Sequence, residues 1–175
     1  MIKLPKFSTQ SLYDSETDFN LQMDRERLSK FLIHYEVFKK IVRIKGDIVE
    51  CGIFKGTSFV RLAMFRELFK KKSKLIGFDI FGDIYPDTSF ENEKKHRDHW
   101  VKSAGHSSIS QKQLDNVFKK KNIKNYKLIK GDVLKTIPEY IKKNKSLKIS
   151  LLNIDLAFVE PTKCCLLYTS PSPRD

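Results

Sequence analysis

Short apolar segments alternate with amphipathic ones along most of this chain. Four mostly apolar segments have the length of buried strands: residues 48–51, 75–78, 126–129 and 149–154. Between them, apolar residues recur at three- and four-residue steps over about 57–71, 110–121 and 134–143, and an earlier amphipathic helix is predicted from Asp24 to about Val42. This alternation of strands and helices predicts an α/β fold with a mainly parallel sheet.

Three segments depart from this pattern. The strand predicted at 149–154 is almost wholly apolar, which is typical of a central strand covered on both faces. Residues 1–22 are polar and predict an N-terminal arm. Residues 81–108 are irregular and predict an insertion that covers a substrate. In that insertion, His96 and His99 could share a helical face, but a third metal ligand is not evident.

Acidic residues follow each of the four predicted strands. Glu50 and Gly52 end the first strand, Asp79 the second and Asp155 the fourth, while Gly131 and Asp132 follow the third. Because the carboxyl ends of parallel strands meet at one edge, where ligands of open α/β sheets bind, these acids are expected to lie close together. Four acids favour a positively charged nucleoside over a polyphosphate, and Asp79 is placed to accept two ribose hydroxyls.

The loop after the first strand has the composition of a ligand-binding turn. Gly52 and Gly56 bracket it, and Thr57 and Ser58 then begin a predicted helix. Glycine permits close approach of the backbone to a ligand, and a helix start offers unpaired N–H groups. The phosphate-binding Gly-Lys-Ser/Thr sequence and the dinucleotide-binding glycine fingerprint are both missing. Taken alone, the loop fits an ordinary βα turn equally well.

Composition narrows the classes of partner. The 175 residues suit one domain, and the formal net charge is +13. Lysine runs at 70–72, 119–121 and 142–143 fall near predicted helix ends, where cations complement the helix dipole. We therefore expect solvated lysines, with unspecific polyanion binding second and no sequence-specific nucleic-acid partner. The three cysteines lack disulfide or zinc spacing, and no long apolar run is present, so a cytoplasmic protein without a membrane partner is predicted.

Several segments together resemble class I S-adenosylmethionine-dependent methyltransferases, and more narrowly the macrocin O-methyltransferase family, whose members methylate sugar hydroxyls. The segments that carry the resemblance are Gly46–Gly52 with Lys55 and Gly56, Gly77–Asp79, residues 104–105 with 108–110, residues 130–132 with 136–138, and residues 151–155 with 160–163.

The resemblance implies a Rossmann-like, doubly wound sheet and a small-molecule sugar substrate, with a homo-oligomer as an open alternative. It implies that S-adenosylmethionine contacts Glu50, Cys51, Gly52, Gly56, Thr57, Ser58, Asp79, Gly131 and Asp132. Asp79 would hold the ribose, and Asp132 would accept the adenine amine. Asp155 would be both catalytic and a ligand to a divalent ion, usually magnesium, that binds the reacting hydroxyl.

Two features separate this chain from the family pattern. Ala157 and Val159 stand where the family has Asp and Tyr, and residues 165–175 resemble a translated sequencing adapter. We therefore expect an arm at 1–22, a truncated methyltransferase domain at 23–163 without its last strands, and a non-native tail at 164–175. An inactive chain is expected, with a catalytically silent α/β binding domain or a basic nucleic-acid-binding protein as alternatives.

Overall fold

The computed structural model describes residues 9–82, 91–105 and 107–169, and the chain divides into two compact units at residues 39 and 40. The first unit contains α1 (Ser11–Gln22) and most of α2 (Arg25–Ile41). The segment predicted as an arm therefore contains a helix, although α1 has no buried residue. Asp24 begins α2 as predicted, because its Oδ1 accepts the N–H of Arg27 at 2.8 Å.

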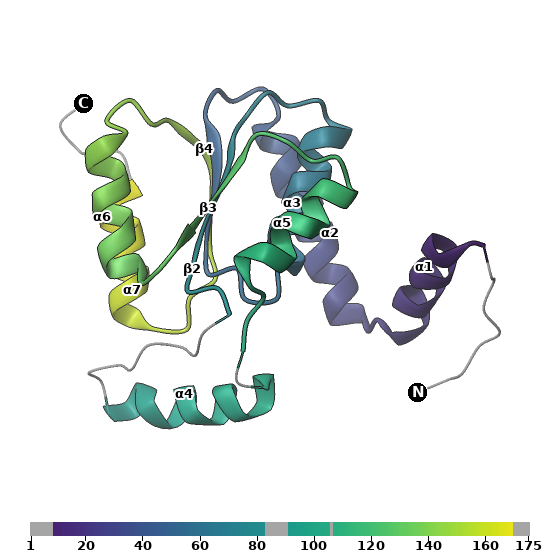
Figure 1. The fold of residues 1–175 in the computed structure, drawn as a ribbon, viewed down its shortest axis with the longest axis horizontal. Helices are drawn as coiled ribbons and strands as arrows, with labels where there is room; N and C mark the ends of the chain where they lie inside the picture. Colours follow the sequence, from purple (N-terminus) through teal and green to yellow (C-terminus); the bar gives the residue numbers. More distant parts are fainter. Residues whose placement is uncertain (1–8, 83–90, 106, 170–175) are drawn as a thin grey trace. The chain divides into compact units, whose positions relative to one another are not determined.

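The second unit is an α/β domain, which confirms the fold class (Figure 1). Its strands match the four predicted segments within a residue or two. In chain order the elements are β1 (Asp47–Cys51), α3 (Thr57–Leu68), β2 (Leu75–Asp79), α4 (Glu91–Ala104), α5 (Gln111–Lys120), β3 (Tyr126–Lys130), α6 (Val133–Lys143), β4 (Ile149–Ile154) and α7 (Val159–Thr169).

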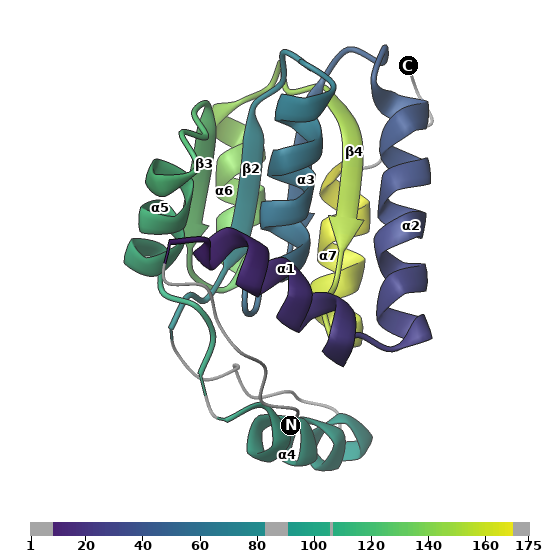
Figure 2. The same ribbon diagram turned by 90° about the vertical axis from the view of Figure 1, so that its right-hand side faces the viewer.

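All four strands of the described sheet are parallel and lie in the order β3-β2-β1-β4 (Figure 2). In the register, Val49 of β1 lies opposite Ile76 on one side and Leu152 on the other. The chain winds from β1 to β3 in one direction and then returns to place β4 on the other side of β1. This reversal creates a switch point between β1 and β4, the place where open α/β sheets bind ligands.

The position of β4 corrects one prediction. Within the described sheet β4 is an edge strand, not a central one, and all of its residues are half-buried. Its apolar residues Ile149, Leu152 and Ile154 pack against the buried cluster on the α6–α7 face. An edge position for β4 agrees with the expectation of a domain without its last strands.

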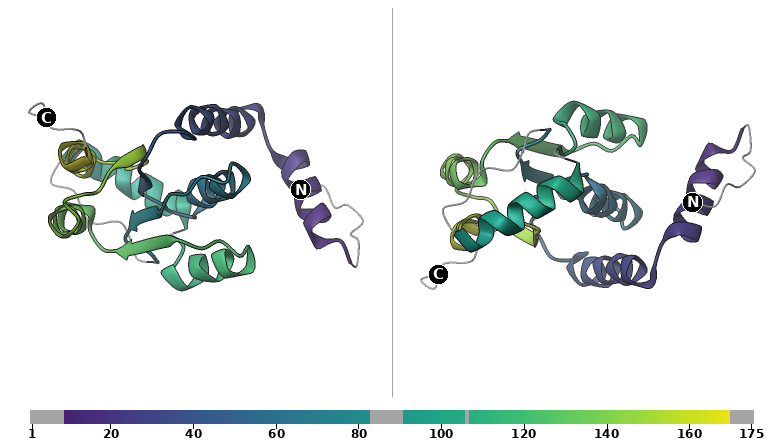
Figure 3. Two further views of the ribbon diagram at one scale, coloured as in Figure 1. Left: turned by 90° about the horizontal axis from the view of Figure 1, so that it is seen from above. Right: turned by 90° about the horizontal axis from the view of Figure 1, so that it is seen from below.

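Helices cover both faces of the sheet, α6 and α7 on one and α3 and α5 on the other (Figure 3). On the α6–α7 face, the buried cluster consists of Val49, Cys51, Ile76, Phe78, Val133, Ile137, Tyr140 and Cys165. On the other face, Phe59 of α3 stacks on Phe118 of α5 with ring centroids 5.7 Å apart, and both side chains are fully buried. These two apolar layers hold the strand ends rigidly.

The region predicted as an irregular insertion contains α4, so it is more regular than expected. Pro86 and His106 of that region lie outside the described residues. His96 and His99 are both exposed on α4. In the parts of the chain that the structure describes, every helix is too short or too polar to cross a membrane.

Candidate functional site

The carboxyl ends of the strands bring the sequence-predicted residues to one edge of the sheet. The N–H of Gly131 donates to the carbonyl of Asp79 at 3.0 Å, and the N–H of Asp155 donates to the carbonyl of Cys51 at 2.9 Å. The loops that follow β2 and β3, and those that follow β1 and β4, are therefore joined in pairs by backbone hydrogen bonds. The loops that carry the acids therefore meet at one edge of the sheet, as expected.

Gly52 lies at the tightest point of this edge. Its φ is +88°, and a Cβ atom built on it would lie 2.2 Å from the carbonyl oxygen of Asp155. Both the left-handed backbone and the lack of space require glycine. The loop after β1 therefore passes against the end of β4 at the switch point, where a side chain would separate them.

The Gly52–Gly56 loop leads directly into α3. Gly56 adopts φ +85° as the residue before the helix, Thr57 is exposed, and Ser58 is half-buried. The Ser58 hydroxyl donates to Glu50 Oε1 at 2.5 Å, and the Glu50 side chain is completely buried. Glu50 therefore lies beneath the loop and ties β1 to α3. Its contact with a cofactor stays a prediction.

Asp79 holds the glycine loop in place. Its side chain is 8% exposed, and its Oδ2 accepts the backbone N–H groups of Ile53 at 2.7 Å and Phe54 at 3.0 Å. Its Oδ1 accepts the N–H of Phe81 at 2.8 Å. A carboxylate has about four acceptor positions, and three amides already use them in this arrangement. The predicted ribose contact would have to share these oxygens with the loop.

Ser108 was missed by the sequence analysis except as part of the family resemblance. Its hydroxyl accepts the N–H of Gly82 at 2.8 Å and lies 3.5 Å from Asp79 Oδ1. The N–H of Ile109 donates to the carbonyl of Phe54 at 2.8 Å. The two ends of the insertion, residues 82 and 108–109, are thus fastened to Asp79 and the glycine loop.

Glu93 was also missed, and it connects the insertion to α7. This residue belongs to α4, and its Oε1 accepts the N–H of Val159, the first residue of α7, at 2.9 Å. The carboxylate therefore satisfies one of the unpaired amides at a helix start. Glu93 follows no strand, so the pattern that located the other acids could not have found it.

A pocket opens at the same edge, with about 430 Å³ of free space including the part open to solvent. The cavity itself measures only about 40 Å³, below the usual range for small-molecule sites, so a ligand here would also occupy the part open to solvent. It is lined by Asp79, Ile80, Asp132, Val133, Leu156, Ala157, Phe158 and Pro161. The lining is mainly apolar with two carboxylates, one of which, Asp132, is half-buried and accepts the N–H of Leu134 at 2.9 Å as the cap of α6.

The thiol of Cys51 faces the core and not the pocket. A hydrogen bond with Cys165, together with burial, raises the pKa of Cys51, so this thiol is neutral. Cys51 can therefore serve a ligand only through its backbone. Its partner Cys165 and the neighbouring Cys164 are buried in α7, which continues through residues 164–169 of the predicted tail.

Asp155 is exposed beside Gly52. Within the described residues, no group of three or more His, Cys, Asp or Glu side chains is arranged to hold a metal ion. Ala157, at the position of the second family acid, lines the pocket without offering a ligand atom. The described residues therefore do not form a magnesium site by themselves.

Comparison with known proteins establishes the fold. No protein-family profile matches the sequence, and no curated protein matches it significantly. Two structures of CalS11, a calicheamicin methyltransferase also described as a TDP-rhamnose 3'-O-methyltransferase, share the fold with a TM-score of 0.63. Their sequence identities are 20% and 21%, and the alignments cover 95% of this chain but only 66% and 65% of theirs.

The O-methyltransferase NovP has the same fold, with a TM-score of 0.66 at 14% identity, over 79% of this chain and 58% of that one. This chain thus spans about two thirds of the length of the CalS11 chains. At these identities the similarity shows a shared α/β fold.

Proposed function

We propose that this chain is the cofactor-binding part of an S-adenosylmethionine-dependent O-methyltransferase that acts on a sugar hydroxyl. The observation that carries the proposal is the pocket at the carboxyl edge, which has an apolar lining and the carboxylates of Asp79 and Asp132. A flat apolar wall suits an adenine ring, and carboxylates suit its amine and the ribose hydroxyls. The fold shared with CalS11 and NovP supports the same class of reaction.

The residues of the edge would divide the binding between them. The loop that begins at Gly52 and is held by Asp79 would lie against the methionine part of the cofactor. Asp132 would accept the adenine amine from the rim of the pocket. Bound S-adenosylmethionine would supply an activated methyl group. The exposed carboxylate of Asp155 would orient the acceptor hydroxyl and take its proton.

The resemblance also implied magnesium, and the described residues do not fit it. Asp155 offers one carboxylate, and Ala157 and Val159 offer none where the family pattern has ligating or polar residues. No step of the proposed reaction is therefore assigned to a metal.

Calorimetry with S-adenosylhomocysteine on the full chain tests the cofactor site. Asp132→Ser keeps a capping hydroxyl for α6 but withdraws the carboxylate from the pocket, so we expect affinity to fall about tenfold with little change in stability. Glu139→Ser, on the exposed side of the same helix, is the control and should bind normally. An unmodified chain that does not bind S-adenosylhomocysteine would contradict the proposal.

Transfer of a labelled methyl group to a nucleotide-linked deoxysugar tests the reaction. We expect Asp155→Asn to bind S-adenosylhomocysteine normally and to lose at least about a hundredfold in transfer, the usual scale for a general base. A chain that binds the cofactor but transfers no methyl group to any acceptor sugar would favour the alternative, a catalytically silent binding domain. The observation that favours a silent binding domain is Ala157, which stands where the family pattern has an acid.

A further inference from the structure

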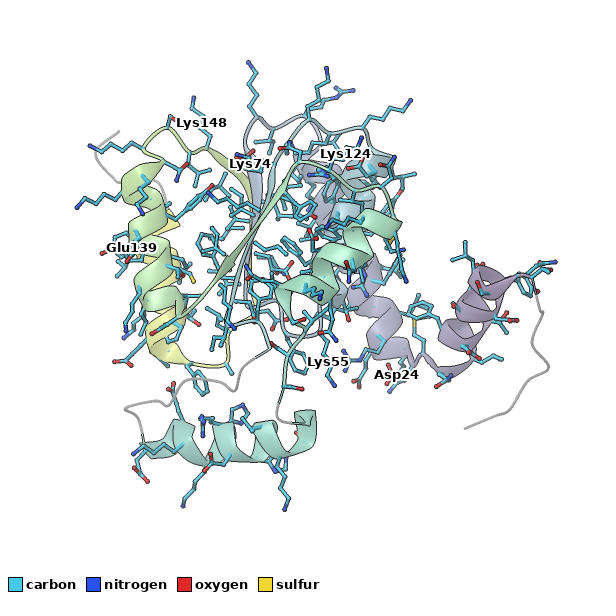
Figure 4. The ribbon with its side chains drawn as sticks, in the orientation of Figure 1. Asp24, Lys55, Lys74, Lys124, Glu139 and Lys148 are labelled. Atoms are coloured by element: carbon cyan, nitrogen blue, oxygen red, sulfur yellow. The ribbon has the colours of Figure 1, made fainter. Side chains whose placement is uncertain are left out.

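The edge of the sheet opposite the pocket carries a concentration of lysines. Four loops precede the four strands there, and each presents an exposed lysine one or two residues before its strand: Lys45, Lys74, Lys124 and Lys148. Figure 4 shows Lys74, Lys124 and Lys148 at the same end of the α/β unit, away from Lys55 of the glycine loop. Other exposed cations in these loops are Arg43, Lys70, Lys72, Lys121 and Lys145.

The helix dipole does not account for these four lysines. Cations interact favourably with a helix C-terminus only within its last turn. Lys120 and Lys143 occupy such positions at the ends of α5 and α6. Lys74, Lys124 and Lys148 lie several residues beyond the ends of α3, α5 and α6. They therefore form an excess of positive charge that the helices do not require.

Acidic residues near these loops are already engaged. Asp47 Oδ1 accepts the backbone N–H of Lys74 at 2.9 Å, and Glu67 pairs with Arg66 at 2.6 Å. In the described parts of the chain, none of the salt bridges involves Lys45, Lys74, Lys124 or Lys148. Their charge is therefore available to a partner.

The lysine-bearing loops are fixed to one another by hydrogen bonds. Arg66 of α3 is only 3% exposed, and its guanidinium donates to the carbonyls of Ser73 at 3.1 Å, Asn125 at 2.7 Å and Lys124. This joins the loops before β2 and β3.

The remaining loops are joined through Gly46. Its carbonyl accepts the hydroxyls of Ser73 at 2.7 Å and Ser150 at 3.0 Å, and the N–H of Asp47 donates to the carbonyl of Lys148 at 2.7 Å. The four lysines consequently project from one connected backbone network. A partner does not have to order these loops in order to meet their charges.

The chemistry of the edge favours an anionic lipid surface over nucleic acid. The cations precede neighbouring strands, which are spaced about 4.8 Å apart, so they form a row along the edge that a planar surface can contact at several points. They are lysines, whose aliphatic stems suit a lipid interface. Ile44 and Leu68, which are 50% and 69% exposed, add aliphatic side chains beside them.

Lysines alone can bind a nucleic-acid duplex unspecifically, but tight binding of single strands and bidentate phosphate contacts draw on other groups. Sequence-independent binding of single strands relies on exposed aromatic side chains, and bidentate hydrogen bonds to phosphate are made by arginine. In the described loops Arg43 is the exposed arginine while Arg66 is buried, and Phe69 and Tyr126 are only partly exposed. We propose that this amino edge, defined by Lys45, Lys74, Lys124 and Lys148 with Ile44 and Leu68, docks on the surface of an anionic phospholipid bilayer.

The docking does not depend on the proposed methyl transfer, and it leaves the pocket at the opposite edge open. The test is co-sedimentation of the full chain with vesicles of phosphatidylcholine alone and of phosphatidylcholine mixed with phosphatidylglycerol. We expect binding only to the mixed vesicles, decreasing as salt is added.

Two charge variants distinguish binding by the amino edge from an effect of net charge alone. In one, Lys45, Lys74, Lys124 and Lys148 are all replaced by Glu; in the other, the exposed Lys95, Lys102, Lys112 and Lys135 are replaced by Glu. Each lysine near an anionic surface contributes about fivefold, so the first variant should lose at least about a hundredfold in affinity. The second should retain most of the binding. Equal losses in both would overturn the proposal.

Two further arms complete the experiment. Ile44→Ser with Leu68→Ser should reduce vesicle binding several-fold while leaving its salt dependence unchanged. Fluorescence anisotropy with a labelled nucleic-acid duplex measures the affinity for nucleic acid, the competing class of partner. Tight duplex binding together with failure to bind mixed vesicles would overturn the assignment to lipid. Circular dichroism spectra that match the unmodified chain ensure that each loss reports the surface and not unfolding.

Discussion

At both edges of the sheet a buried charged side chain holds the loops together, but the charge is negative at one edge and positive at the other. At the carboxyl edge, loops present backbone N–H groups, and the buried carboxylate of Asp79 accepts them from Ile53, Phe54 and Phe81. At the amino edge, loops present carbonyl groups, and the buried guanidinium of Arg66 donates to those of Ser73 and Asn125. At each edge a buried charged side chain thus holds loops together.

The direction of the chain explains the difference. Helices of a parallel α/β fold run opposite to the strands, so helix starts with unpaired N–H groups lie at the carboxyl edge and helix ends with unpaired carbonyls at the amino edge. Acidic side chains are stabilised at the first and basic ones at the second. Helix direction therefore accounts for the acids of the pocket edge and for lysines in last helical turns, such as Lys120 and Lys143. The lysines that directly precede the strands lie beyond those turns and add further positive charge.

The largest loss of stability is expected at Gly52, where the carboxyl edge has no space for a side chain. Gly52→Ala should lower the free energy of unfolding by at least about 4 kcal/mol, because the new Cβ atom would collide with the Asp155 carbonyl and because alanine is strained in a left-handed backbone conformation. Gly105→Ala is the matched control, since Gly105 has φ +83° but no atom within 4 Å of an added Cβ. It should lose about 1 kcal/mol in urea denaturation. Equal losses would show that strain alone decides the position.

Removing the buried cation should break the amino edge. Arg66→Met leaves several loop carbonyls without their donor, and we expect a loss of about 3 kcal/mol in the free energy of unfolding. Glu67→Gln changes only the exposed partner and should cost less than about 1 kcal/mol. If Arg66→Met were as mild as its control, the network would not be what fixes the loops.

Asp79→Asn tests the corresponding ion at the carboxyl edge. The amide nitrogen would face backbone N–H groups on one side of the side chain, so about 2 kcal/mol of stability should be lost. Hydrogen exchange at Ile53, Phe54 and Phe81 should become faster. Exchange at Leu75, whose N–H donates to the Asn125 carbonyl at the amino edge, should not change. Uniformly faster exchange would instead indicate global destabilisation without a separate role at this edge.

The smallest effect at neutral pH concerns Tyr126, at the start of β3. Burial, followed by a hydrogen bond to Asp115, raises the pKa of Tyr126 to about 12. In the unfolded chain a tyrosine ionises near pH 10, so stability from the neutral phenol is fully present below about pH 10 and is lost as the pH rises toward 12. Unfolding in urea should thus show a steeper loss above pH 10 for the unmodified chain than for Tyr126→Phe. Parallel curves would contradict the raised pKa.

Local patterns in the sequence were sufficient to predict the helices and strands, and to predict which edge of the sheet carries the acids. Helical spacing located α3, α5 and α6, and Ser110 begins α5 in a capping box, with its N–H donating to Gln113 Oε1 at 2.9 Å. Acids directly after strands share one edge because parallel strands all point the same way. These features depend on neighbours in the chain, which is why they could be predicted.

The tertiary structure alone decided what those side chains do. Asp79 accepts amides from residues 25 and 26 positions away, and Arg66 binds carbonyls 58 and 59 positions away, so no local pattern shows either role. The same holds for Glu93 at the start of α7. The lysines were visible as runs, but only strand order brought those of four separate loops to one edge, because sheet pairing joins segments that the sequence keeps apart.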